Sequence, residues 1–381
     1  MSFSRSSAPS ALASLALALL VGCGPSDGSR ELAAGRAAYE AGNLEKAGAL
    51  LLKSERLNAT NADTQVCLAL VNLRKGALAE AEAHIERAEA LAGGDVDVRL
   101  LGAQIAWHRQ DAQKALRLFA SVAEDASLDA ALRARGWTGL GIAQMTSDAY
   151  DLARISFLRA IRLDRMNASA RYHLGHLYRY APFAYPEMSL EQFEIFVRLA
   201  KESDARVQKT LSAIIPSLKD AIAQSTMDVP GAATRNSSAS AAALSRAEKA
   251  WKKGSYAAAA AAYREAFSAD PLAYPAAVGL ARALAKTATT AAGRKQALDC
   301  YRKACALRPS AVSTLIEAGD LAERLGQVAT ARGIFSRAVA ANPASPDAID
   351  GLIRALRKAG DKSAAAAYQS YRETLPRHTR R

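Results

Sequence analysis

The chain of 381 residues is 50% hydrophobic but only 6% aromatic, and it carries a formal net charge of +13. Alanine supplies much of the apolar content and favours helices, and the length allows two or three domains or one long repetitive core. Beyond Cys23 three cysteines remain, an odd number that argues against a disulfide framework and favours small buried side chains at Cys67, Cys300 and Cys305.

The first 22 residues have the features of a secretory signal. Arg5 is their only charge, and the apolar run over residues 11–21 is too short to span a bilayer as a helix. The run ends in Leu20-Val21-Gly22-Cys23, which resembles the lipobox of bacterial lipoproteins. The resemblance implies a signal peptide over 1–22, lipid on Cys23 and a tether over 23–29. An ordinary signal peptide or an uncleaved anchor, with Cys23 incidental, is the alternative.

A lipidated Cys23 predicts a location in the bacterial cell envelope. Several acyl chains hold a protein at a membrane essentially permanently. Residue 24 is glycine, whereas an aspartate there retains enterobacterial lipoproteins at the inner membrane, so we expect the outer membrane, facing the periplasm. No later segment reaches 18 uncharged apolar residues, so no transmembrane helix is predicted.

Small residues then recur with a period of 34 residues. Gly42 and Ala47 return as Gly76 and Ala81, and the same pattern appears late in the chain, where Gly326 is followed by Gly360. A period in this range indicates a stack of helical hairpins.

The individual units resemble the tetratricopeptide repeat family. One unit shows Trp137, Leu140 and Gly141 in its first half, then Phe157 with alanines at 153 and 160 in its second half. The resemblance implies an all-α solenoid of about nine helix–turn–helix units. Their expected ranges are 28–61, 62–95, 96–129, 134–167, 168–203, 240–273, 274–311, 312–345 and 346–379.

Residue size within the units predicts their packing. Glycines such as Gly141 and Gly319 are expected where the two helices of a hairpin touch, and large side chains such as Phe157 and Phe335 where a hairpin meets the next one. Glycine at the turn, in a left-handed conformation, ends the first helix. These turn glycines are Gly42, Gly76, Gly254, Gly326 and Gly360.

The fifth unit departs from the pattern through an insert over residues 180–186. The insert is rich in aromatic residues and proline, and Ser189 with Gln192 predicts a helix start after it. Two interpretations stay open: a recognition loop, or a plug that closes a distorted repeat.

A bridging helix over 204–223, bent at Pro216, and a flexible linker over 224–239 are expected next. They divide the repeats into an amino-terminal block of five units (30–203) and a carboxy-terminal block of four (240–379).

No catalytic constellation stands out, so the chain is predicted not to be an enzyme and to use no cofactor. His173 and His176 could bring two imidazoles near one metal, but no third ligand is evident and no metal site is predicted.

Binding residues are instead expected on the concave face, which the first helix of each unit lines in this family. The resemblance points to Gln104, Trp107, His108, Arg135, Tyr172, His176, Arg179 and Tyr180. A second, mostly basic set lies in the carboxy-terminal block: Trp251, Lys252, Arg282, Lys286, Arg354, Arg357 and Lys358.

The sequence therefore predicts a lipid-anchored scaffold or adaptor that binds a protein or peptide partner without catalysis. The alternatives are a binder of anionic glycan or another polyanion through the basic set, and a non-catalytic subunit of an envelope enzyme or secretion complex. The envelope location makes nucleic acid a poor candidate partner.

Overall fold

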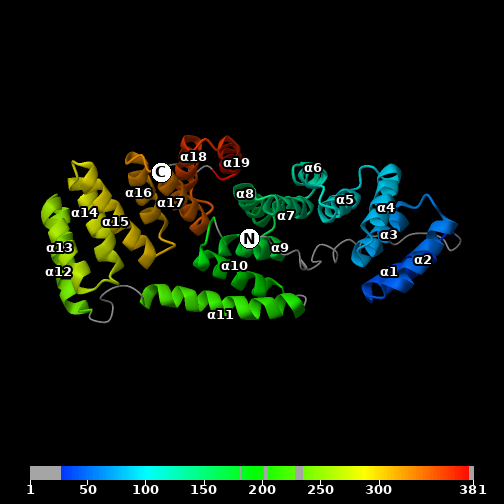
Figure 1. The fold of residues 1–381 in the computed structure, drawn as a ribbon, viewed down its shortest axis with the longest axis horizontal. Coiled ribbons are helices and arrows are strands. Elements are labelled where there is room, and N and C mark those ends of the chain that lie inside the picture. The colour runs from blue at the N-terminus through cyan, green and yellow to red at the C-terminus, as the bar shows by residue number, and fades with distance from the viewer. Residues whose placement is uncertain (1–26, 181, 201–204, 228–234, 377–381) are drawn as a thin grey trace. The chain divides into compact units, whose positions relative to one another are not determined.

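The computed structural model describes residues 27–180, 182–200, 205–227 and 235–376, and within these ranges it contains helices and turns but no strand (Figure 1). The predicted signal peptide and Cys23 lie outside the described residues. The fold is all-α and built from helical hairpins, as the sequence predicts.

The helices up to residue 199 form the first five hairpins. They are α1 (Ser29–Glu40), α2 (Leu44–Leu57), α3 (Ala62–Lys75), α4 (Leu78–Leu91), α5 (Val96–His108), α6 (Ala112–Ala123), α7 (Ala130–Thr146), α8 (Tyr150–Leu163), α9 (Ala168–Arg179) and α10 (Pro186–Leu199).

A long single helix and four further hairpins follow. They are α11 (Ala205–Met227), α12 (Ser237–Lys252), α13 (Tyr256–Ala269), α14 (Tyr274–Thr287), α15 (Ala291–Leu307), α16 (Val312–Arg324), α17 (Val328–Ala341), α18 (Pro346–Lys358) and α19 (Lys362–Glu373).

Two helix boundaries next to the predicted linker differ from the sequence expectation. α11 continues to Met227 with Pro216 inside it, and α12 already begins at Ser237, because Asn236 caps it by accepting a hydrogen bond from the Ala239 amide at 3.0 Å. Helix therefore occupies both ends of the segment predicted as a linker, and residues 228–234 lie outside the described ranges.

The chain forms two compact units. One contains residues up to 173 together with 199–207, and the other contains 174–198 together with everything from 208 onward. Within the second unit, the Tyr185 hydroxyl donates to the Gly333 carbonyl at 3.3 Å, and Arg337 pairs with Glu187 at 3.1 Å. The sequence places the α9–α10 hairpin in the amino-terminal block, whereas residues 174–198 of this hairpin lie in the second unit. The boundaries of the two predicted blocks remain a prediction.

Turn glycines end the first helices of the hairpins as predicted. Gly42 and Gly76 have φ of +77°, and the remaining predicted turn glycines lie between +70° and +82°. Gln110 occupies the corresponding turn after α5 with φ of +70°, a conformation that costs a side chain with a Cβ roughly 1–2 kcal/mol.

Glycine-to-aromatic contacts hold the two helices of a hairpin close together. A Cβ added at Gly141 would lie 2.6 Å from the Phe157 ring, and one added at Gly319 would lie 2.7 Å from the Phe335 ring. The Phe335 ring also lies against Gly351 in the next hairpin. Both predictions are confirmed: glycines lie where the two helices of a hairpin touch, and the large Phe335 side chain also contacts the next hairpin.

The first helices of successive hairpins also contact one another. α1 contacts α3, α3 contacts α5 and α5 contacts α7 in one unit, and α12 contacts α14 and α16 contacts α18 in the other. These helices therefore line a shared inner face in each unit. Among the described residues, no helix combines the length and apolarity needed to cross a membrane.

The insert in the fifth repeat is largely packed. Phe183 and Tyr185 are buried, and the centroid of each ring lies 6.0 Å from that of Tyr178, whereas Tyr180 is exposed. The insert therefore resembles the predicted plug more than a free recognition loop.

The predicted helix start at Ser189 is wrong. α10 begins at Pro186, whose fixed φ suits the first helical position. Ser189 is buried, and its hydroxyl donates to the Gly175 carbonyl of α9 at 2.8 Å.

Candidate functional site

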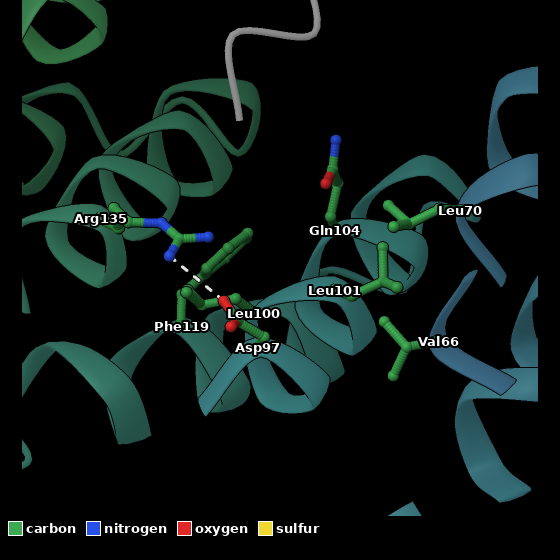
Figure 2. A pocket seen from close by; sticks show the side chains of 8 residues that line it. All are labelled: Val66, Leu70, Asp97, Leu100, Leu101, Gln104, Phe119 and Arg135. Carbon is green, nitrogen blue, oxygen red and sulfur yellow. Dashed lines mark hydrogen bonds and ion pairs between the residues drawn. The ribbon is translucent and has the colours of Figure 1, made fainter. Parts of the chain in front are cut away.

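A small apolar groove, with a cavity volume of about 30 Å³, lies on the inner face of the first unit, and three successive hairpins contribute to it. Val66 and Leu70 come from α3, and Leu100 and Leu101 from α5 (Figure 2). Phe119 of α6 completes the apolar floor, and the polar lining residues are Asp97, Gln104 and Arg135.

The charges in this groove are paired with each other. Arg135 Nη1 donates to Asp97 Oδ1 at 3.2 Å, which joins α7 to α5, as the dashed line in Figure 2 shows. The Arg135 side chain is only 18% exposed. The cation that the sequence proposed for binding is thus largely satisfied within the protein.

Gln104 differs from its charged neighbours. Its amide has no hydrogen-bond partner among the described residues, and Figure 2 shows it pointing away from the apolar floor. A primary amide can donate to a carbonyl and accept from an N–H, so Gln104 can bind one peptide unit of a ligand.

Trp107 and His108 lie at the end of α5 and have partners of their own. The Trp107 indole N–H donates to the Thr146 hydroxyl at 3.1 Å, and its ring meets His108 edge-on at 4.8 Å. Burial lowers the pKa of His108. Trp107 therefore joins α5 to α7, and the half-buried ring is only partly available to a ligand.

The predicted histidine pair serves packing. His173 stacks on Phe157 at 5.9 Å, and Tyr172 meets the His173 ring edge-on at 5.3 Å. Burial raises the pKa of Tyr172.

His176 packs edge-on against Phe193 at 5.0 Å. Burial, together with the Arg179 charge, lowers the pKa of His176 to about 4. The Arg179 guanidinium lies 5.1 Å from the Tyr180 ring centroid. Within the described ranges, no group of three or more potential metal-binding side chains is found.

In the second unit, acids of a neighbouring hairpin pair with half of the predicted basic residues. Arg282 pairs with Glu317, Arg354 pairs with both Asp320 and Glu323, and Lys358 also pairs with Glu323. The acids that pair with the two arginines lie 31 to 35 residues from them, about one repeat. That spacing is the sequence signal that could have revealed them.

The other predicted residues of this set have fewer partners. Arg357 reaches the Gln369 side chain at 3.5 Å, Trp251 meets the Tyr256 ring edge-on at 5.0 Å, and Lys252 and Lys286 have no acid partner in the part of the chain that the structure describes. The set does not form one continuous basic surface.

A hollow of about 290 Å³ lies beside these residues. Trp251 and Arg282 line it, as predicted, and so do several residues that the sequence did not single out: Glu248, Tyr263, Tyr274, Pro275, Val278, Gly279 and Arg308.

Comparison with models of known families identifies the family of the carboxy-terminal repeats. The family model for the tetratricopeptide repeat matches residues 284–346 and 316–377. This part of the chain belongs to the tetratricopeptide-repeat family. The two matched ranges cover α15 to α19, and within them Gly319 and Gly351 pack against the Phe335 ring, as glycines pack against aromatic rings in earlier repeats.

Solved structures of other proteins, including a tetratricopeptide-repeat protein, have distant similarity to the chain. One from Thermus thermophilus is 15% identical over 49% of this chain and 98% of that one, with a TM-score of 0.43. Pseudomonas aeruginosa pilF is 18% identical over 50% and 88%, with a TM-score of 0.40. MamA from Desulfovibrio magneticus RS-1 is 15% identical over 48% and 99%, with a TM-score of 0.39. No curated protein sequence matches the chain.

Proposed function

We propose that this tetratricopeptide-repeat protein is a non-catalytic, lipid-anchored scaffold that binds an uncharged, extended segment of a partner protein in the groove of its first unit. The observation that carries the proposal is the lining of that groove by the inner helices of three successive hairpins. The repeats themselves support a role as a protein-interaction scaffold.

The spacing of the inner helices suits an extended chain. Packed helices lie roughly 8–10 Å apart, and an extended segment advances about 3.3 Å per residue. A partner segment would therefore advance about three residues for each hairpin it crosses. Alternate side chains would face the apolar floor, while the Gln104 amide bonds one peptide unit.

The charge distribution favours an uncharged ligand. Arg135 and Asp97 neutralise each other, and the other groove-lining side chains carry no charge. Moving an unpaired charge from water into this groove would cost desolvation free energy, and no ion pair in the groove would offset that cost.

The polyanion alternative has less support. Arg282, Arg354 and Lys358 are paired with acids, so an anionic glycan would have to displace those carboxylates. Steep salt dependence of retention on an anionic matrix would favour this alternative.

Membrane anchoring through Cys23 is the second part of the proposal, and it rests on the lipobox resemblance. Cys23→Ser is expected to abolish incorporation of an alkyne-labelled fatty acid and to move the protein from the membrane to the soluble fraction. A variant that stays labelled and membrane-bound would contradict the anchor.

Gln104→Glu tests the groove, because the change is nearly isosteric and adds one charge. We expect it to reduce co-purification of the partner from solubilised membranes at least tenfold. Gln113→Glu, at an exposed position of α6 outside the groove, is the matched control and should have no effect. Equal co-purification by both variants, with unchanged circular dichroism, would remove the groove assignment.

A further inference from the structure

The hollow in the second unit differs in chemistry from the apolar groove of the first. Aromatic side chains from three helices surround it: Trp251 of α12, Tyr263 of α13 and Tyr274 of α14. Arg282 and Arg308 add guanidinium groups, and Val278 adds an apolar surface.

Hydrogen bonds hold two of the side chains that line the hollow, both on α14. The hydroxyls of Tyr274 and Thr314 lie 2.6 Å apart, which ties α14 to α16. Arg282 donates two hydrogen bonds to Glu317, at 2.8 and 2.7 Å. The hollow is therefore preformed on its α14 side, which lowers the entropic cost of binding.

Arg308 differs from Arg282 in its contacts. It follows α15, and its guanidinium carbon lies 4.5 Å from the centroid of the Tyr274 ring. In the part of the chain that the structure describes, no carboxylate lies within ion-pair distance of Arg308. The position of the guanidinium over the ring leaves its N–H groups able to donate to a carboxylate.

Glu248 limits how much negative charge the hollow can accept. It is exposed and lines the same hollow, so it would repel a ligand with several negative charges. Arg282 is already neutralised by Glu317. One cation thus remains for one anionic group, and a polyanion is disfavoured.

We propose that this hollow binds the side-chain carboxylate of one aspartate or glutamate in an extended partner segment, with Arg308 as its donor and with the neighbouring apolar residue against Trp251 and Val278. The inference rests on the proposed function, because it assumes a polypeptide ligand that crosses the inner helices. It adds a second site with a different ligand chemistry, so the scaffold would select two features of its partners.

The test uses the full-length protein and short unlabelled peptides. The acidic probe is Ac-GSFDLSG-NH2, and Ac-GSFNLSG-NH2 differs from it only by an amide in place of the carboxylate. A third peptide, Ac-GSFNLSG-OH, carries its only carboxylate at the chain end. Isothermal titration calorimetry gives the affinity of each.

We expect the acidic probe to bind at least tenfold more tightly than its amide counterpart, and Arg308→Ala to reduce this preference to less than twofold. Arg302→Ala is the matched control, because Arg302 is an exposed arginine of α15 that pairs with Asp299 at 3.2 Å. It should leave the preference intact. Trp251→Ala should weaken both capped peptides.

The inference would be overturned by no binding of the acidic probe at millimolar concentration, by equal binding of both capped peptides, or by a preference that survives Arg308→Ala. Stronger binding of the peptide with the free terminus would also overturn it, by assigning the site to a chain end instead. Partner co-purification that still depends on Gln104 would show that the proposed function stands even if this site fails.

Discussion

Arg282 and Glu317 form a two-pronged ion pair, in which Nε and Nη2 of the arginine donate to the two carboxylate oxygens at 2.8 and 2.7 Å. The Tyr301 hydroxyl donates to the same carboxylate at 2.9 Å. The pair joins α14 to α16, the first helices of successive hairpins. Cations on the inner face thus stabilise the stacking of repeats.

Glu317→Ala should therefore weaken the second unit. The change removes three hydrogen bonds to a charged group that is partly exposed, so we expect a loss of about 1–2 kcal/mol in the free energy of unfolding. Urea unfolding followed by circular dichroism measures it. Asp299→Ala, which removes an exposed i, i+3 pair with Arg302, should cost less than about 0.5 kcal/mol. Equal effects of the two changes would contradict the stabilising role.

Gly141→Ala should destabilise the α7–α8 hairpin. The new Cβ would lie 2.6 Å from the fully buried Phe157 ring, and such overpacking costs about 1–3 kcal/mol, more than the roughly 1 kcal/mol gained in helix propensity. Gly333→Ala is the control, because a Cβ there meets no atom within 4 Å. It should be neutral or stabilising. Thermal unfolding of both variants compares them, and destabilisation by Gly333→Ala alone would contradict the packing.

Gln110→Gly should stabilise the first unit. Gln110 takes a left-handed φ of +70° where five other repeats have glycine, and relief of this strain is worth about 1 kcal/mol. The expected result is a higher urea midpoint without any change in the helical signal. A lower midpoint would show that the Gln110 side chain makes a contribution larger than the backbone strain.

His176 should make stability depend on pH between about 6.5 and 4. Its folded pKa is about 4, below the unfolded value near 6.5, so the unfolded chain binds the proton first as the pH falls. Stability is complete above pH 6.5 and decreases by up to about 3 kcal/mol as the pH approaches 4. His176→Gln should flatten this part of the curve of unfolding free energy against pH. Parallel curves for the two proteins would contradict a buried, neutral imidazole.

Most of the fold follows from local signals in the sequence. The 34-residue recurrence of Gly42 and Gly76 predicts the hairpin turns because only glycine adopts their left-handed φ cheaply, and both angles are +77°. The start of α10 was missed because Ser189 looks like a helix cap, whereas Pro186 already begins the helix and Ser189 bonds to Gly175 from inside it.

The candidate sites were less predictable because they depend on which repeats face each other. Gln104 and Arg135 follow from the repeat resemblance, but the apolar groove floor, including Leu100 and Leu101, cannot be distinguished from core by helical spacing alone. Asp97 lies 38 residues from Arg135, so their pairing requires the stacked geometry. Arg308 was missed because it follows a helix instead of lying on an inner one.

Site-specific photocrosslinking in native membranes tests the central claim, that a partner occupies the groove of the first unit. A photoreactive amino acid replaces Gln104 in the groove or Gln113 outside it, and adducts are separated by mass. We predict one discrete adduct, of the same partner segment, from position 104 and none from position 113. Adducts of equal yield from both positions, or from position 113 alone, would contradict the claim.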